Sequence, residues 1–127
     1  SFEIRVRGKG YLSVQLPDGS MAYTKSAVIS PNDSGVLATE DGYELTPTVT
    51  VNTSATSRRI EVDGVVVALL PPAPNWNFEG QLVLYSFEDP SKLKPIGAGL
   101  YRKTSGSGPA LQSTAGIDGF GTIEVTE

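Results

Sequence analysis

The residues of this chain that could carry chemistry begin with a pair of glycines. Gly8-Lys9-Gly10 follows the alternating run Phe-Glu-Ile-Arg-Val, and a strand that leads into a Gly-x-Gly turn can open a phosphate-binding loop. A dinucleotide fingerprint needs a third glycine, a P-loop needs Gly-Lys-Ser/Thr, and a helix follows either motif. The strand-like run Tyr-Leu-Ser-Val comes next instead. The two glycines are therefore predicted to form a turn or bulge rather than a phosphate site.

Carboxylates offer a second possibility, a pair of acids for acid–base catalysis. Glu40-Asp41 is the tightest acidic pair, and Glu79, Glu88 and Asp89 are grouped later in the chain. Glycoside hydrolysis needs two carboxylates that face each other across a cleft. Because Glu40-Asp41 falls at a predicted turn and Asp89 is placed to cap a helical turn, solvated or capping roles are favoured over catalysis.

Trp76 is the third candidate, because a tryptophan with Phe78 and Tyr85 nearby could form a stacking platform for a sugar ring. The alternative role is a plug that covers an open end of a β-sandwich. The plug is the favoured interpretation, and the sugar platform stays open as a second hypothesis.

The composition restricts the remaining chemistry. With no cysteine and no histidine, the chain has no disulfide, no cysteine nucleophile and no Ser-His-Asp triad. The net charge of -4 favours neither nucleic acid nor an anionic membrane, and the pair Arg58-Arg59 is interpreted as a solvated strand face. The longest apolar run, Val65–Leu70, is too short to cross a bilayer. No catalytic residue, cofactor or metal is predicted.

The elements that position these residues are predicted to be strands. Helical periodicity is nearly missing, whereas short β-branched or aromatic runs bounded by Gly, Pro, Asn and Asp recur. The pattern predicts a single all-β domain over residues 1–127, a compact β-sandwich or barrel-like arrangement of short antiparallel strands and hairpins. The predicted strands are Phe2–Val6, Tyr11–Leu16, Met21–Ile29, Gly35–Thr39, Tyr43–Val51, Ser57–Val62, Val65–Leu70, Gln81–Phe87, Gly99–Lys103 and Thr122–Val125.

Turn signals separate these runs. The Asp-Gly pairs predict type I′ turns, with hairpin tips at Asp18-Gly19 and Asp63-Gly64; the other two pairs are Asp41-Gly42 and Asp118-Gly119.

The sequence also predicts the character of three connecting segments. The Pro-rich segment Leu70–Gly80 is expected to be irregular, and the glycine-rich segment Thr104–Gly121 is expected to be a long flexible loop. Near residues 89–94, Asp89 and Pro90 predict at most one short helical turn.

The order of short motifs along the chain resembles the central domain of the rod and hook proteins of bacterial flagella. The Leu-Pro-Asp-Gly and Ile-Gly-x-x-Leu-Tyr elements are most similar to the distal-rod members, while proximal-rod and hook members share much of the pattern. Each motif alone is mostly turn and strand residues, so the shared order across almost the whole chain carries the resemblance. The motifs are Gly8-x-Gly10-Tyr11-Leu12-x-Val14, Leu16-Pro17-Asp18-Gly19, Tyr23-Thr24-Lys25, Gly35–Tyr43 with Leu45 and Pro47, Gly80-Gln81-Leu82 to Phe87, Asp89-Pro90, Leu93, Pro95-Ile96-Gly97, Leu100-Tyr101-x-x-Thr104 and Ser107-Gly108.

The chain departs from the family pattern at three places. The family has Gly-x-Phe where this chain has Ser26-Ala27-Val28, and Leu70–Asn77 has no counterpart. Lys25 replaces an arginine, which keeps the charge and loses the bidentate fork.

The resemblance implies a structural subunit of the flagellar basal body and no enzymatic activity. Residues 1–127 would be the central domain, with terminal coiled-coil helices missing from this sequence. The implied partners are further copies in a helical axial assembly, other rod subunits, the hook protein and the surrounding rings. The implied location is the rod that spans the periplasm, reached by type III export without a cleaved signal peptide. Hairpin tips and Thr104–Gly121 are the expected subunit contacts. A hook or proximal-rod subunit and a carbohydrate-binding module using Trp76 are the alternatives.

Overall fold

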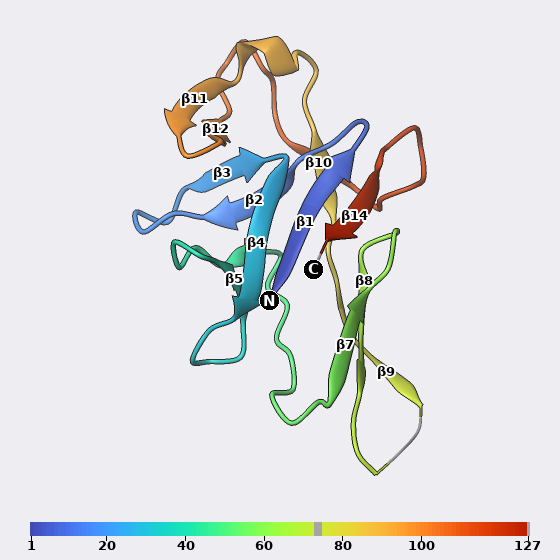
Figure 1. Ribbon diagram of the computed structural model, residues 1–127. Coiled ribbons are helices and arrows are strands. Elements are labelled where there is room, and N and C mark those ends of the chain that lie inside the picture. The colour runs from blue at the N-terminus through green and yellow to red at the C-terminus, as the bar shows by residue number, and fades with distance from the viewer. Residues whose placement is uncertain (73–74, 127) are drawn as a thin grey trace.

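The computed structural model describes residues 1–72 and 75–126, and strands dominate both ranges (Figure 1). The helical content of these ranges is one 3-10 turn, η1 (Pro90–Lys92), which confirms the expectation of an all-β fold with at most one helical turn near residues 89–94. The strands in chain order are β1 (Phe2–Arg7), β2 (Leu12–Gln15), β3 (Met21–Thr24), β4 (Ser26–Pro31), β5 (Leu37–Thr39), β6 (Leu45–Thr46), β7 (Ser57–Ile60), β8 (Val65–Leu69), β9 (Trp76–Gln81), β10 (Leu84–Ser86), β11 (Lys94–Gly97), β12 (Leu100–Arg102), β13 (Leu111–Ser113) and β14 (Thr122–Thr126).

The strands pair into separate antiparallel sheets. Their strand orders are β14-β1-β4-β5, β11-β12-β3-β2-β6, β7-β8-β9 and β10-β13. Within the described ranges these sheets stay open, so no barrel closes. Figure 1 shows β1 and β4 running across the direction of β2 and β3. The two ends of the domain lie side by side, because β1 pairs with β14 from Glu3↔Thr126 to Arg7↔Thr122.

One hydrophobic core joins the sheets, and alternation within each strand supplies it. In β1, Ile4 and Val6 are buried while the residues on either side of them are exposed, as expected for a strand with one face on a core. The other strands contribute in the same way. The largest fully buried apolar side chains are Ile4, Leu12, Val14, Ile29, Leu37, Val66, Leu84 and Ile123.

The β2–β3 hairpin is buried on both faces. Leu12 and Val14 point into the main core. On the opposite face Tyr23 packs against Phe87 in a T-shaped contact, with ring centroids 4.8 Å apart, in a second cluster that also holds Leu93. This hairpin therefore lies between two apolar clusters and is the centre of the fold.

Lys25 divides what the sequence predicted as one strand, Met21–Ile29, into β3 and β4. The two strands belong to different sheets, so the chain turns a corner at Lys25. Its ammonium Nζ donates to the carbonyl oxygens of Gly8 at 2.6 Å and Gly10 at 2.7 Å, and it lies 4.9 Å from the ring centroid of Tyr11. The corner between β1 and β2 is thereby tied to the corner between β3 and β4.

The hairpin tips are where the sequence placed them, but their geometry is mostly a different one. At Asp18-Gly19 only the glycine has a positive φ (88°), and Gly19 N–H donates to the Leu16 carbonyl at 2.9 Å. This is a type I turn closed by a left-handed glycine, a common three-residue hairpin loop. The same hydrogen-bond pattern closes the turns at Gly42 and Gly64. The type I′ prediction is therefore wrong at these three tips.

The Asp118-Gly119 pair does show the predicted geometry. Both residues have positive φ, 53° and 79°, as a type I′ turn requires. This tip lies inside Thr104–Gly121, which was expected to be a loop. That expectation is wrong in part, because the segment contains β13 and buries Ser107 and Ala115 completely or nearly so.

Three strands, β9, β11 and β13, were missed because their sequences lack the usual strand signals. β9 lies in the Pro-rich stretch and pairs with β8, while β13 is polar and pairs with β10. β11 contains Pro95, which an edge strand tolerates since it needs donors on one side only. Conversely, the predicted strand Tyr43–Val51 is reduced to β6. Ala73 and Pro74, in the segment expected to be irregular, lie outside the described residues.

Candidate functional site

The Gly8-Lys9-Gly10 corner offers carbonyl oxygens to a cation, whereas a phosphate loop offers N–H donors to an anion. Both glycines have positive φ, 100° and 124°, and a strand follows them as predicted. A Cβ on Gly10 would lie 3.0 Å from the Cβ of Leu84, so the corner also needs glycine for space. The cation that occupies the corner is the ammonium of Lys25, and burial lowers the pKa of this group. The prediction of structural corner glycines is confirmed.

The candidate carboxylates are not gathered at one place. Glu40-Asp41 forms the turn between β5 and β6, and Asp89 caps η1 by accepting a hydrogen bond from Ser91 N at 3.1 Å. Glu79 lies on β9 in an ion pair with Arg58. In the described ranges, 1–72 and 75–126, no group of three or more His, Cys, Asp or Glu side chains is placed to hold a metal.

Arg58 and Arg59 differ from the solvated pair that the sequence suggested. Arg58 points toward the core side of β7, and its side chain is largely buried in its contact with Glu79. Arg59 points outward, where its Nε lies 3.1 Å from Oε1 of Glu61 and its guanidinium carbon lies 4.4 Å from the Trp76 ring centroid. The prediction is correct for Arg59 and wrong for Arg58.

Trp76 is not a plug in an open end of the core. It lies on the edge strand β9 with 38% of its surface exposed, and Phe78 beside it is 69% exposed. Tyr85 lies elsewhere, packed against Tyr23 with ring centroids 5.8 Å apart. The predicted aromatic platform is therefore reduced to Trp76 and Phe78, and the guanidinium of Arg59 occupies one face of the Trp76 ring.

The outward face of the β7-β8-β9 sheet is an apolar surface with one cation. Cross-strand register places Arg59, Val67 and Phe78 in one row and Ser57, Leu69 and Trp76 in the next. The opposite face of the same sheet buries Ile60, Val66 and Ala68 in or beside the core. We call the outward surface the aromatic ledge; it consists of Ser57, Arg59, Val67, Leu69, Trp76 and Phe78.

A groove with acidic residues at one end lies between three turns. Two adjoining hollows, about 160 and 560 Å³ in volume, share Tyr43, Ala98 and Leu100 as lining residues. Glu40 and Asp41 line the smaller hollow. We call this surface the acidic groove; the residues that line its acidic end include Ser26, Glu40, Asp41, Tyr43, Ala98 and Leu100.

The far end of the acidic groove is held by an ion pair. Arg102 Nη2 lies 3.2 Å from Asp18 Oδ2, which links β12 to the β2–β3 tip. Hydrogen bonds from the Ser20 side chain and then from its backbone N–H, followed by the Arg102 contact, lower the pKa of Asp18 to about 2. Asp18 therefore carries its charge throughout the neutral range.

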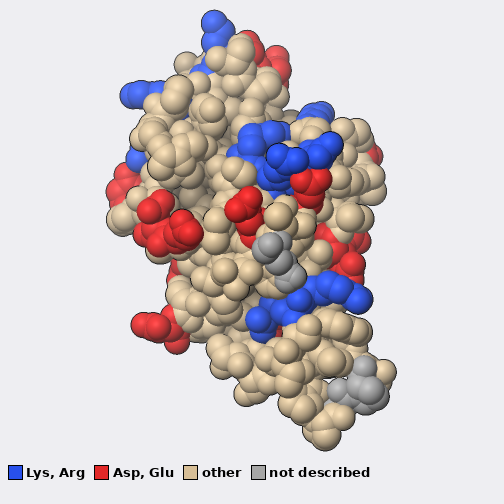
Figure 2. Space-filling model, in the orientation of Figure 1, with Lys and Arg blue, Asp and Glu red and all other residues tan. Residues whose placement is uncertain are grey.

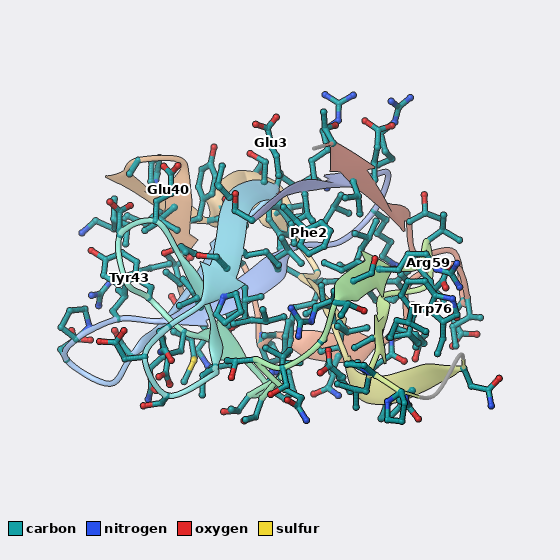
Figure 3. All side chains as sticks on the ribbon, turned by 60° about the horizontal axis from the view of Figure 1, so that its bottom comes forward. Phe2, Glu3, Glu40, Tyr43, Arg59 and Trp76 are labelled. Atoms are coloured by element: carbon teal, nitrogen blue, oxygen red, sulfur yellow. The ribbon has the colours of Figure 1, made fainter. Side chains whose placement is uncertain are left out.

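The two surfaces lie on opposite sides of the molecule. Figure 3 shows Glu40 and Tyr43 on one side and Arg59 and Trp76 on the other. In Figure 2 acidic side chains gather on the left side of the view, and a basic band crosses the region of β7 and β8. Sequence reasoning did not join these residues into surfaces, because each surface combines segments that are far apart in the chain.

A known family model matches the N-terminal half of the chain. Residues 5–68 match the family model for the D1 domain of the flagellar hook proteins FlgE, FlgF and FlgG, a span that includes the glycine corner, Lys25 and the Glu40-Asp41 turn.

Among curated proteins, the flagellar basal-body rod protein FlgG of Caulobacter vibrioides is 36% identical over 121 residues, covering 95% of this chain and 46% of that protein. FlgG of Buchnera aphidicola (subspecies Acyrthosiphon pisum) is 32% identical over 97% of this chain, and FlgG of Bacillus subtilis is 29% identical over 94%. The chain spans about half the length of these relatives, 46% to 47%. With its all-β fold, its glycine corner and this match over half of its residues, the chain belongs to the family of flagellar hook protein FlgE/F/G D1 domains.

Proposed function

We propose that this chain is the β-rich central domain of a structural subunit of the bacterial flagellar basal body, which polymerises into the distal rod and transmits motor torque to the hook. The observation that carries the proposal is the match to flagellar basal-body rod proteins along 94% to 97% of the chain. The motif order noted in the sequence extends through the same residues.

The arrangement of the two ends supports a domain carried on flanking segments. Five consecutive residues of β1 pair with β14. A segment that precedes β1 and a segment that follows β14 would therefore meet the domain at the same place. Coiled-coil helices on both sides would then leave side by side and could pack together. Load applied there acts on paired strands that are tied to the core through Ile4 and Ile123.

The proposed partners are copies of the same subunit, other rod subunits, the hook protein and the rings around the rod. The proposed location is the periplasm-spanning part of the rod, reached by type III export without a cleaved signal peptide. The role is mechanical, with no catalysis, and involves neither nucleic acid nor insertion into a membrane. Among the residues described, no helix is long and apolar enough to cross a membrane.

A domain exchange tests the proposal. The matching segment of Caulobacter vibrioides FlgG is replaced by this chain in a strain that lacks its own FlgG, and basal bodies are purified and imaged. We expect rods that extend to a hook and cells that swim. A stable exchanged protein that leaves the rod short would overturn the proposal, and one that enters only the hook or the proximal rod would support the alternative within the family.

A companion measurement concerns the chain by itself. If flanking helices drive polymerisation, the isolated chain stays monomeric or associates weakly in sedimentation velocity. Long polymers of the isolated chain would contradict that division of roles.

The exposure of Trp76 favours keeping one alternative from a different class, a carbohydrate-binding module. Trp76 is the single tryptophan of the chain, so its fluorescence reports directly on this surface. A glycan that shifts the tryptophan emission of the wild-type protein, and whose binding heat measured by calorimetry disappears in Trp76→Phe, would support the alternative. We expect no such shift, because Arg59 already covers one face of the ring.

A further inference from the structure

We propose that neighbouring copies of this domain bind head to tail, with the aromatic ledge of one copy seated in the acidic groove of the next. The inference rests on the proposed function, because it names the contact through which copies of the subunit would touch. It concerns two surfaces that the fold places on opposite sides of one molecule (Figure 3).

The aromatic ledge has the composition of a protein contact. Trp76 and Phe78 are exposed to 38% and 69%, although aromatic side chains of this size are usually buried. Tryptophan and arginine are the residues that most often dominate binding energy at interfaces. Arg59 lies across the Trp76 ring, which holds both side chains in one orientation before any partner arrives.

Arg59 has donors to offer to a second carboxylate. Within the described residues only its Nε has an acceptor, Oε1 of Glu61. Its two terminal nitrogens have no acceptor among the described residues and can donate to an incoming acid. The ledge therefore presents a guanidinium that is paired with Glu61 and still has terminal donors, set in an aromatic surface.

The acidic groove is complementary to the ledge in charge and in surface type. Glu40 and Asp41 are adjacent, and neither has an ion-pair partner among the described residues. Tyr43 and Leu100 supply apolar lining that the rings of Trp76 and Phe78 would cover. The carboxylates at one end are placed to receive Arg59.

Binding between unlike surfaces decides the kind of assembly. If two ledges met each other, two Arg59 side chains would face each other, and two grooves would bring four carboxylates together; both arrangements are disfavoured by like charge. A ledge in a groove leaves a free groove on one copy and a free ledge on the other. Such a heterologous contact continues into an open helical array.

Disulfide trapping tests the contact, because the chain contains no cysteine of its own. Ser57→Cys places a thiol on the ledge, Ser26→Cys places one in the groove, and both positions are exposed. Under oxidation we expect the double variant to form a ladder of dimers, trimers and longer chains. The matched control combines Ser57→Cys with Ser91→Cys, which is exposed, belongs to neither surface and lies outside Thr104–Gly121.

The single variants separate the two possible symmetries. Ser57→Cys and Ser26→Cys proteins mixed together should form mixed dimers faster than either forms dimers with itself. A ladder no stronger than that of the Ser91→Cys control, or self-dimers of Ser57→Cys that form as readily as mixed dimers, would overturn the proposal.

Charge exchange supplies a second readout on the same proteins. Arg59→Glu in the Ser57→Cys copy should lower the yield of mixed dimers at least about tenfold, since a like charge then faces Glu40 and Asp41. Glu40→Arg in the Ser26→Cys copy should restore the yield with Arg59→Glu and lower it with wild-type Arg59. Circular dichroism spectra of each variant check that the fold is kept.

The exchanged Caulobacter protein distinguishes this inference from the proposed function. If rods that carry Ser26→Cys and Ser57→Cys assemble but contain no subunit-to-subunit disulfide, the rod assignment stands and the contact is wrong. If the isolated chain forms the ladder but the exchanged protein builds no rod, the contact stands and the rod assignment is wrong.

Discussion

Arg58 Nε lies 2.7 Å from Glu79 Oε1, and this ion pair joins the two outer strands of the β7-β8-β9 sheet across the strand between them. The Arg58 and Glu79 side chains are only 14% and 5% exposed. Both side chains also bind the backbone of Asn52. Arg58 Nη2 donates to the Asn52 carbonyl oxygen at 2.8 Å, and the Asn52 N–H donates to Glu79 Oε2 at 2.7 Å. The pair thus fixes the segment that leads into the sheet.

Removing one member of this pair should be costly. Glu79→Ala leaves the Arg58 charge buried without its carboxylate and leaves Asn52 N–H without its acceptor. We expect the free energy of unfolding to fall by about 3 kcal/mol, the range seen when a buried ion pair is broken. Urea denaturation measures the loss.

The exposed pair on the same strand provides the control. Glu61→Ala removes the partner of Arg59, whose side chain is largely in water, and should cost no more than about 1 kcal/mol. Equal losses for Glu61→Ala and Glu79→Ala would show that burial does not set the strength of the Arg58 contact.

Gly64 and Gly19 occupy equivalent tips with nearly equal φ, 89° and 88°, but differ in surroundings. A Cβ on Gly64 would meet the Leu82 carbonyl oxygen, whereas one on Gly19 would have nothing within 4 Å. Gly19→Ala should therefore cost only the strain of a left-handed alanine, about 1 to 2 kcal/mol. Gly64→Ala should cost at least about 2 kcal/mol more because the backbone must also move.

Thermal or urea unfolding of the two alanine variants measures the two losses of unfolding free energy. Equal losses would mean that the approach of Leu82 to the tip is not maintained in solution. The comparison is well controlled, because the backbone conformation is the same at both sites.

Asp18 should titrate well below an ordinary aspartate. Hydrogen bonds from Ser20 and the nearby Arg102 lower its pKa from 3.8 to about 2. Because the pKa is lower in the folded state, the stabilisation is present above pH 3.8 and is lost as the pH falls toward 2. Carbon-detected NMR titration should show the low pKa, and Ser20→Ala should raise it more than Arg102→Gln does. An unchanged pKa in Ser20→Ala would contradict the assignment.

Alkaline pH should destabilise the domain through its aromatic cluster. Burial raises the pKa of Tyr23, Tyr85 and Tyr11 above 10.0, with smaller contributions from neighbouring tyrosines at Tyr23 and Tyr11. A raised pKa in the folded state contributes stability below pH 10 that is lost as the pH rises through the folded value. Burial of Lys25 lowers its pKa and acts in the opposite direction. The three tyrosines therefore contribute a loss of stability at alkaline pH, which Lys25 opposes.

Urea midpoints measured from pH 8 to pH 11 test this expectation. Tyr23→Phe keeps the ring in the cluster and removes the titrating hydroxyl, so the alkaline loss should be smaller by up to about 1.4 kcal/mol per pH unit. A pH profile identical to that of wild type would show that Tyr23 does not contribute.

Local signals in the sequence were sufficient for much of the fold. The alternation in β1, the Asp-Gly tips and the Asp89-Pro90 start of η1 all depend on neighbours within a few residues, and each was found at the predicted place. The motif order was also sufficient to identify the family, since it needs no knowledge of contacts.

Features that depend on how strands pair and how side chains meet were decided only by the tertiary structure. β9 pairs with its neighbour in the chain, β8, but the Pro-rich connection between Leu69 and Trp76 gave no hairpin signal, so β9 was missed and the tryptophan was placed in the wrong role. Lys25 lies in a continuous β-rich run, and its role at the corner follows from the carbonyls of Gly8 and Gly10. Arg58 and Arg59 are adjacent in the chain, yet strand alternation gives one to the core side and the other to solvent. Sequence by itself determines which segments can turn or extend, because those preferences are local; the register between strands determines which side chains meet, because it is set by the packing of the whole core.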